Sequence, residues 1–404
     1  MKNTVLFFIF LFIISCLGQV ASDIYLPALP AIRNALGTTT HLVQFSIAVF
    51  MFGFAVSHLV YGPISDSVGR KKPLIIGILI CIIGTFLCQY ATSIHPFLLG
   101  RLLQGAGAGA GAALFRSILR DVYSGDHLAK VSSIFAVSRV FLLASSPLIG
   151  GYLLHFFGWR SCFLFLNIYA GISLIGSILV MKETNKYMHL HSSQISYIAK
   201  NAWTLISSPI FMGYSFCILL AFGGILAWIT TLPIILQEVV GLTPVEFGWV
   251  SAIAGLFFIV GGFANAMLVT RFGLDKMLKV GLAIMLLAGL IMLVFGLFGD
   301  INTFVIMFPV VIYILGTSMI FSNAYAGAFH PFPKIAGTAG AIFGFLQIIG
   351  GAISSMIMSF VHAYNQIPLS LALIASSVLA FIVVVFATRG YVPDPSLGDS
   401  SSPI

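Results

Sequence analysis

Some ionisable side chains lie within long apolar stretches of this chain, where they could do chemistry. Asp23 follows Ser15 and Gln19 at intervals of four residues, so the three side chains share one face of a helix. A carboxyl group inside a membrane segment is costly and should face a wet cavity or a partner, which makes Asp23 a candidate proton carrier. The alternative is an ionised residue at the membrane surface, because a helix that starts near Thr4 has risen about 28 Å by this point.

Two arginines also lie in apolar helical stretches. Arg101 cannot lose its charge, and Arg139 falls roughly 11 residues into a predicted helix, near the middle of a membrane. Two fixed positive charges against the single acid Asp23 favour an anionic or carboxylate-bearing substrate over a cationic drug. The alternative for Arg139 is a structural ion pair with a carboxylate elsewhere in the chain.

The overall composition indicates a membrane protein. Of 404 residues, 59% are hydrophobic and 7% are charged, and the mean hydropathy is +1.09, whereas soluble domains average about 25% charged residues. A chain of this length has room for roughly twelve spanning helices. We therefore expect the lipid bilayer as a partner and no nucleic acid, despite a net charge of +8. The five cysteines show no metal-ligand spacing, so no metal site is expected.

The apolar stretches predict two sets of six helices with edges good to a few residues. A polar stretch at 183–208 divides the chain into an N-terminal bundle at 1–182 and a C-terminal bundle at 209–389, followed by a Pro/Ser-rich tail at 390–404 that we expect to be disordered. The predicted helices cover about 4–33, 42–65, 73–91, 96–120, 128–157 and 160–182, then about 209–237, 244–270, 277–298, 302–326, 336–363 and 368–388.

Basic residues fall mainly on one side of this topology, which predicts that both termini are cytoplasmic. Only Arg33 and Arg160 fall on the other side. The cytoplasmic set is Lys2, Arg70, Lys71, Lys72, Arg120, Lys130, Lys182, Lys186, Lys200, Arg271, Lys276, Lys279, Lys334 and Arg389.

A charged loop between the second and third predicted helices carries the pattern G-x-x-x-D-x-x-G-R-K, on Gly62, Asp66, Gly69, Arg70 and Lys71. The two glycines are expected to permit a tight turn there. The segment R-F-G-L-D-K at 271–276 occupies the same place in the second half and resembles a degenerate repeat of the loop. An echoed loop between two six-helix halves indicates a duplicated transporter architecture with cytoplasmic linker 183–208.

This loop resembles the loop between helices 2 and 3 of the major facilitator superfamily. Further stretches resemble the Bcr/CflA group of drug-resistance exporters: S-D-I-Y-L-P-A-L-P from Ser22, G-R-L-L-Q-G-A-G-A from Gly100, R-S-I-L-R-D from Arg116 and F-P-K-I-A-G-T-A-G from Phe332. The resemblance covers nearly the whole chain. It implies an all-α membrane protein with twelve transmembrane helices in two pseudo-symmetric bundles.

The resemblance also implies a conformational latch. Asp66 would face the positive N-terminus of the eleventh helix near Gly337, and Arg70 would pair with Asp121. Both contacts would form only when the two halves close on the cytoplasmic side. Ser67 stands where the family usually has a basic residue.

Two further sets of residues take roles from the resemblance. Arg101 would be a cavity residue that couples to protonation of Asp23. The stretch with Ser146, Pro147, Gly150 and Gly151 is similar to the antiporter signature G-P-x-x-G-G, with Ser146 in place of the first glycine, and implies a hinge and a seal against ion leak.

Other polar residues in apolar helices are candidates for the substrate cavity, although hydrogen bonds that pack helices together explain several of them equally well. With Gln19 and Arg139, the candidates are Trp228, Asn323 and Gln347.

These observations predict a proton-coupled exporter of small molecules in the bacterial cytoplasmic membrane, working as a monomer by alternating access. The alternative is a carrier of an anionic metabolite or a siderophore-like polycarboxylate, in either direction. No catalytic cluster or nucleotide-binding motif is present, so we expect no enzyme and no cofactor other than the proton gradient.

Overall fold

The computed structural model describes residues 4–185, 195–361 and 364–388, and its regular structure there is entirely helical. The first half contains α1 (Thr4–Asp23), η1 (Leu26–Ala28), α2 (Leu29–Ala35), α3 (Thr40–Val68), α4 (Lys71–Gln89), α5 (Ile94–Val122), α6 (Gly125–Phe157) and α7 (Arg160–Leu179). The second half contains α9 (Pro209–Ile234), η3 (Ile235–Val239), α10 (Pro244–Phe272), α11 (Leu274–Leu297), α12 (Thr303–Phe329), η4 (Pro333–Ile335), α13 (Ala336–Phe360) and α14 (Ile367–Thr388).

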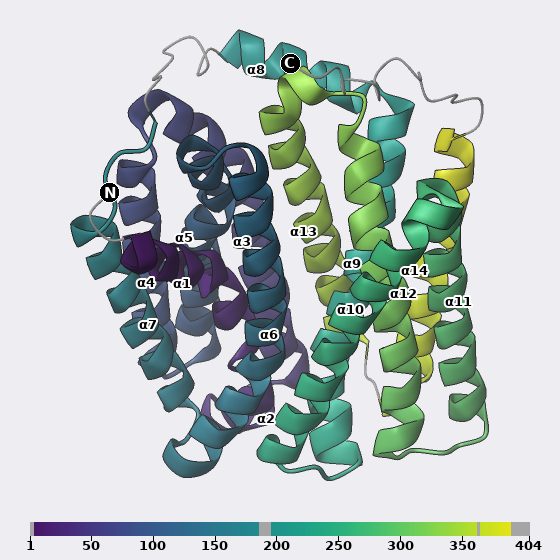
Figure 1. Ribbon diagram of the computed structural model, residues 1–404. Coiled ribbons are helices and arrows are strands. Elements are labelled where there is room, and N and C mark those ends of the chain that lie inside the picture. The colour runs from purple at the N-terminus through teal and green to yellow at the C-terminus, as the bar shows by residue number, and fades with distance from the viewer. Residues whose placement is uncertain (1–3, 186–194, 362–363, 389–404) are drawn as a thin grey trace.

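The two halves stand side by side as two helical bundles (Figure 1). Within the described ranges, ten segments are long and apolar enough to cross a membrane. The other two long helices, α5 with 29 residues and α6 with 33, pack against these segments. The predicted twelve-helix membrane fold is confirmed. Lys2, Lys186, Arg389 and the predicted disordered tail at 390–404 lie outside the described residues.

The first predicted helix, 4–33, is wrong in one respect, because the helix stops at Asp23. A 3-10 turn that contains Pro27 and a short helix that contains Pro30 follow it. Proline lacks a backbone donor and disfavours helical geometry in the residue before it, so two prolines in this short interval interrupt the helix. The interruption is buried, and it leaves Asp23 at the end of α1 inside the bundle rather than at the membrane surface.

The charged loop is shorter than expected, because α3 continues to Val68 and contains Gly62 within the helix. The expectation of a turn at Gly62 is therefore wrong. Gly69 alone makes the turn, with a φ of 90° that favours glycine. Gly273 ends α10 with a φ of 80° in the corresponding place of the second half. The two loops thus share the conformation of their central glycine.

The linker contains a helix that the sequence analysis did not predict, α8 (Ile195–Ile206). It packs against α9 and α13 of the second half, at the end of the bundles opposite α2 (Figure 1). Trp203 of α8 is 71% exposed. Residues 186–194 of the linker lie outside the described residues.

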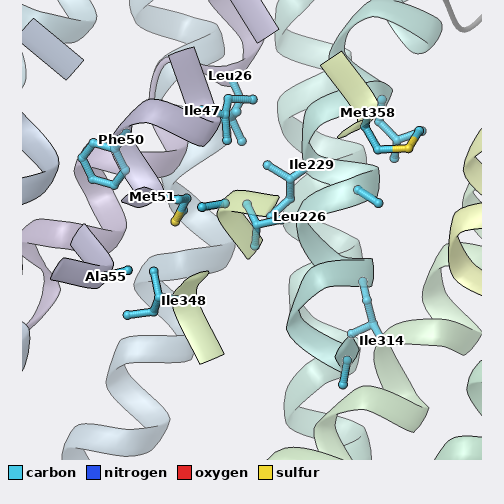
Figure 2. Packing of buried hydrophobic residues seen from close by; sticks show 14 of the residues in the cluster. Leu26, Ile47, Phe50, Met51, Ala55, Leu226, Ile229, Ile314, Ile348 and Met358 are labelled. Atoms are coloured by element: carbon cyan, nitrogen blue, oxygen red, sulfur yellow. The ribbon is translucent and has the colours of Figure 1, made fainter. Parts of the chain in front are cut away.

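Apolar side chains fill much of the space between the halves. The helix α3 packs against α13, and α6 packs against α10. Figure 2 shows side chains from both halves approaching one another in this layer. The labelled members from the first half are Leu26, Ile47, Phe50, Met51 and Ala55, and those from the second are Leu226, Ile229, Ile314, Ile348 and Met358.

Contacts between the halves at the α2 end are mostly closed to solvent. Gln44 of α3 donates a hydrogen bond of 2.8 Å to the carbonyl oxygen of Thr230 in α9, and both residues are buried. Nearer the surface, Arg33 Nη1 and Glu238 Oε2 form an ion pair of 2.8 Å. His41 Nδ1 lies 3.0 Å from the carbonyl oxygen of Ser359.

The halves are more open at the α8 end. Arg116 of α5 lies over the ring of Tyr325 in α12, at 5.1 Å from the guanidinium carbon to the ring centroid. Both residues are nevertheless exposed, Tyr325 by 39%. Arg116 and Tyr325 therefore border open space at this end, whereas Gln44 and Thr230 are closed to solvent at the α2 end.

Candidate functional site

The buried carboxyl group of Asp23 lies at the last residue of α1 and is 2% exposed. Its Oδ2 accepts a hydrogen bond of 2.7 Å from Nε2 of Gln19, one turn earlier on the same helical face. Its Oδ1 has no hydrogen-bond partner among the described residues. The predicted placement of Gln19 and Asp23 on one helical face agrees with this bond, and one carboxyl oxygen remains available to a proton, a water molecule or a ligand.

Arg101 projects from α5 to the same broken end of α1 and is fully buried. Its Nη1 donates to the carbonyl oxygen of Ala21 at 3.0 Å and also to Oε1 of Gln104. The rings of Tyr25 and Phe50 lie 4.1 and 4.2 Å from its guanidinium carbon. The last carbonyls of a helix lack intrahelical partners and carry partial negative charge, so a cation is stabilised there.

Asp23 and Arg101 share one site without forming a direct ion pair. Arg101 binds a carbonyl two residues before Asp23, and its charge acts on that carboxyl group. No Asp23–Arg101 pair occurs within 4.0 Å in the described structure, and Nε and Nη2 of Arg101 have no partner there. The site therefore offers a carboxyl oxygen and guanidinium N–H groups that are both uncommitted.

Sequence reasoning missed Gln104, which fixes the position of Arg101. Gln104 accepts from Arg101 and donates to Oγ1 of Thr85 in α4 at 2.9 Å. Both Gln104 and Thr85 are fully buried. The signal was present in the sequence, because Gln104 follows Arg101 by three residues and so lies on the same helical face.

The predicted pair of Arg70 with Asp121 forms, but it does so without closure of the two halves. Arg70 Nε donates to Asp121 Oδ2 at 3.0 Å, and Arg70 Nη1 binds Asp66. All of these residues belong to the first half, so the Arg70–Asp121 pair needs no closure between halves, and that part of the expectation is wrong. Lys71 Nζ instead donates to the carbonyl oxygen of Ile178 at 2.9 Å.

The expected contact between Asp66 and the start of α13 is not made in this conformation. Within the described residues, the carboxylate of Asp66 binds Arg70 and is 47% exposed. A Cβ added at Gly337 would meet no atom within 4 Å. This open space agrees with the separation of the halves at the α8 end.

Glu183 ties the end of the first bundle to the loop, which sequence reasoning also missed. Its carboxylate accepts from the backbone N–H groups of Arg70 at 2.8 Å and Lys71 at 3.1 Å, at the N-terminus of α4. Partial burial acts to raise its pKa, but these hydrogen bonds and those from Thr184 and Asn185 outweigh burial and hold the pKa below its usual 4.5. The N-terminus of α4 thus holds a carboxylate, as helix termini favour.

The glycines of the antiporter stretch mark close approaches of α6. A Cβ added at Gly150 would overlap the carbonyl oxygen of Ile24 in the interruption after α1, and one at Gly151 would lie 2.5 Å from the carbonyl oxygen of Pro244 in α10. Pro147 lies within α6, and Ser146 donates to the Leu142 carbonyl oxygen at 2.9 Å. This stretch therefore touches both the Asp23 segment and the opposite half.

The remaining cavity candidates differ in their surroundings. Asn323 is 2% exposed, and its Nδ2 donates to Oδ1 of Asn265 at 2.8 Å, which is a packing contact between α12 and α10. Trp228 is half-buried, with no partner for Nε1 among the described residues. Gln347 and Arg139 are also half-buried. Arg139 takes part in none of the three ion pairs found within the described ranges.

No group of three or more potential metal-binding side chains occurs in the residues that the structure describes. All five cysteines are buried and free.

Known proteins match this chain over most of its length. It is 28% identical to the bicyclomycin resistance protein homolog of Haemophilus influenzae, covering 96% of this chain and 97% of that protein. It is also 28% identical to multidrug resistance protein D of Escherichia coli, covering 94% and 95%. A crystal structure of a D-xylose-proton symporter shares the fold with a TM-score of 0.79 at 16% identity, covering 96% of this chain and 98% of the symporter. The sequence model of the Major Facilitator Superfamily matches residues 11–355, and the chain therefore belongs to this superfamily.

Proposed function

We propose that this chain is a proton-coupled exporter of small molecules, of the drug or multidrug efflux type, that works by alternating access. The observation that carries the proposal is the shared site of Asp23 and Arg101, where a buried acid and a fixed cation both keep uncommitted atoms. The resistance proteins that match nearly the whole chain support efflux of drugs. Siderophore transport has no support among these relatives.

The coupling follows from the charges in the site. With Asp23 ionised, its charge offsets that of Arg101, which cannot be neutralised by losing a proton. A proton on Asp23 removes the negative charge and makes the uncommitted Oδ1 a weaker acceptor for a donor group of a substrate. Proton and substrate thus compete for one electrostatic site, which is the requirement for exchange transport.

The asymmetry between the two ends of the molecule supports alternating access. Buried contacts between the halves, such as Gln44 with Thr230, close the α2 end. Exposed facing residues border open space at the α8 end. With the charged loops and both termini on the cytoplasmic side, this conformation opens toward the cytoplasm. Rocking of one half against the other would then expose the site to the outside.

The same proposal assigns a setting to the molecule. It is a multi-pass protein of the bacterial cytoplasmic membrane that acts as a monomer, because each chain carries both bundles. Its partners are lipid, protons and the transported molecule. The proton gradient supplies the free energy, so neither a cofactor nor an enzymatic reaction is needed.

The first prediction tests coupling with an Asp23→Asn variant. Bicyclomycin accumulation is measured in inside-out vesicles that contain the protein, with and without an imposed pH gradient. Wild-type protein should accumulate the drug when the lumen is acidic, and Asp23→Asn should abolish the gradient-driven part because the amide cannot carry the proton.

Asp300→Asn provides the control, since Asp300 is an exposed acid next to α12 and far along the chain from the site. It should transport like wild type. Full gradient-driven transport by Asp23→Asn would remove Asp23 from the mechanism. A parallel comparison of the transport of a cationic dye and of citrate would show whether the protein carries cations or anions.

A further inference from the structure

A second group of basic side chains lies in the first half, partly facing the second half, and the proton site does not use it. Arg116 extends from α5 to the ring of Tyr325 in the opposite half. His58 of α3 faces α13, where its Cδ2 would lie 3.0 Å from a Cβ added at Gly344. Arg139 of α6 lies over Phe115, at 5.8 Å from guanidinium carbon to ring centroid.

Two of these three side chains, Arg116 and Arg139, carry a fixed charge. The charges of Arg116 and Arg139 both act on His58, and Arg116 acts on Arg139. They come from three helices of the first half, and two of them meet residues of the second half directly. We call the three side chains the basic cluster, of which Arg116 and His58 border the second half.

The basic cluster lacks a counter-ion in the described structure. The ion pairs there use Arg33 and Arg70, not Arg116 or Arg139. Asp23 is the only acid of the sequence well inside a spanning segment, and its carboxylate binds Gln19. Intramembrane arginines that face the interior normally have a partner or line a pathway for an ion or substrate. Two arginines without a carboxylate partner therefore point to an anion from outside the chain.

The opposite wall supplies an aromatic surface. The ring of Tyr325 stacks on Phe329 at a centroid distance of 4.2 Å and meets the edge of Phe343 at 5.8 Å. Tyr325 is exposed as well as close to Arg116. A flat apolar ring placed here would contact aromatic faces, and an acidic group attached to it would lie next to Arg116.

We propose that the basic cluster of His58, Arg116 and Arg139 is a binding subsite for the acidic group of an aromatic organic anion, whose ring system packs against Tyr325. This inference rests on the proposed transport function and narrows its substrate class. Arg116 is the residue that an anion entering from the α8 end would meet first, because it is exposed. Arg139 is half-buried and would supply a second fixed positive charge to the acidic group.

The test compares two probes of the same shape, the anion naphthoate and its uncharged amide naphthamide. Binding is measured by equilibrium dialysis against the full chain in nanodiscs of phosphatidylcholine, which carries no net charge. Wild type should bind naphthoate about tenfold or more tightly than naphthamide, as expected for a hydrogen-bonded charge in a partly buried site. Arg139→Gln and Arg116→Gln should each remove most of that preference, and Arg139→Lys should restore part of it.

Arg160→Gln is the matched control, because Arg160 binds the backbone carbonyls of Gln89 and Ala91 at the opposite end of the bundle. It should keep the preference for naphthoate. Equal binding of the two probes by wild type, or an unchanged preference in both Gln variants, would overturn the proposal. Loss of naphthoate binding when phosphatidylglycerol replaces phosphatidylcholine would also overturn it, by assigning the cluster to a lipid headgroup.

The two proposals fail in different ways. Arginine-dependent naphthoate binding without any gradient-driven drug transport would end the exporter function and leave the anion subsite in place. Gradient-driven transport together with naphthoate binding that is unchanged in both arginine variants would rule out the anion subsite alone.

Discussion

Arg101 shows how one residue can depend on several elements at once. It leaves α5, binds a carbonyl at the end of α1 and lies between two aromatic rings. Desolvation of a charge costs several kcal/mol unless polar groups replace water. The carbonyl of Ala21 and the amide of Gln104 supply that replacement, and the remaining N–H groups stay available.

Replacing Gln104 with leucine tests this arrangement. Gln104→Leu removes an acceptor from a buried cation, so we expect a loss of about 1.5–3 kcal/mol in unfolding free energy and weaker gradient-driven transport. Thermal unfolding in nanodiscs and vesicle transport would measure the two effects.

Gln89→Leu is the matched control, because Gln89 is also buried but accepts from the neutral amide of Asn167. Its loss should be nearer 1 kcal/mol, with transport unchanged. If both variants lose equal stability and transport, Gln104 has no special relation to Arg101.

At this scale the sequence revealed which residues were chemically unusual but not their partners. Asp23 and Arg101 could be identified because charges are rare in apolar segments. The Ala21 carbonyl could not, since its availability depends on where α1 stops. The Asn323–Asn265 bond was equally hidden, because either asparagine could have lined a cavity.

At the scale of elements, the close approach of α6 to the interruption after α1 positions the whole site. Gly150 provides that approach, because a side chain there would overlap the Ile24 carbonyl oxygen. The contact involves rigid backbone on both sides, so the elements themselves must separate if the glycine is replaced.

Gly150→Ala should therefore destabilise the fold by about 1–3 kcal/mol, the usual cost of overpacking, and should reduce gradient-driven transport. Gly171→Ala serves for comparison, since a Cβ at Gly171 of α7 meets open space. That variant should unfold at the wild-type temperature or slightly above it, because alanine favours a helix. Equal melting temperatures for the two variants would contradict the role given to Gly150.

Element boundaries followed sequence patterns except where tertiary contacts decided them. The apolar stretches predicted all twelve long helices of the two bundles, and ten of these, within the described ranges, are long and apolar enough to span a membrane. They did not predict the stop at Asp23, because Pro27 could equally have begun a kink. The helix α8 was missed because the linker as a whole is polar. The segment that forms α8 is nevertheless amphipathic, with one apolar and one polar face.

At the scale of the whole molecule, polar contacts join the two halves at the α2 end. The Arg33–Glu238 pair and the Gln44–Thr230 bond span about two hundred residues of sequence. Opening at this end requires both to break. Sequence reasoning placed Arg33 on this side but could not identify its partner, because the pairing depends on how the bundles meet.

Charge reversal tests the closure. Arg33→Glu places two carboxylates together and should shift the population toward opening at the α2 end, whereas Arg33→Glu with Glu238→Arg should restore closure. Surface ion pairs contribute about 0.2–1 kcal/mol, so the population should change up to about fivefold. Faster hydrogen exchange in the backbone of η3 and the start of α3 would measure the opening. No difference between the single and double variants would exclude the pair from the closure.

The burial of all five cysteines has a practical consequence. Thiol-specific reagents should react slowly with the native chain in this conformation, so one engineered surface cysteine could be labelled against the wild-type background. Movements of the two bundles could then be followed by fluorescence without first removing the native thiols and disturbing the packing around them.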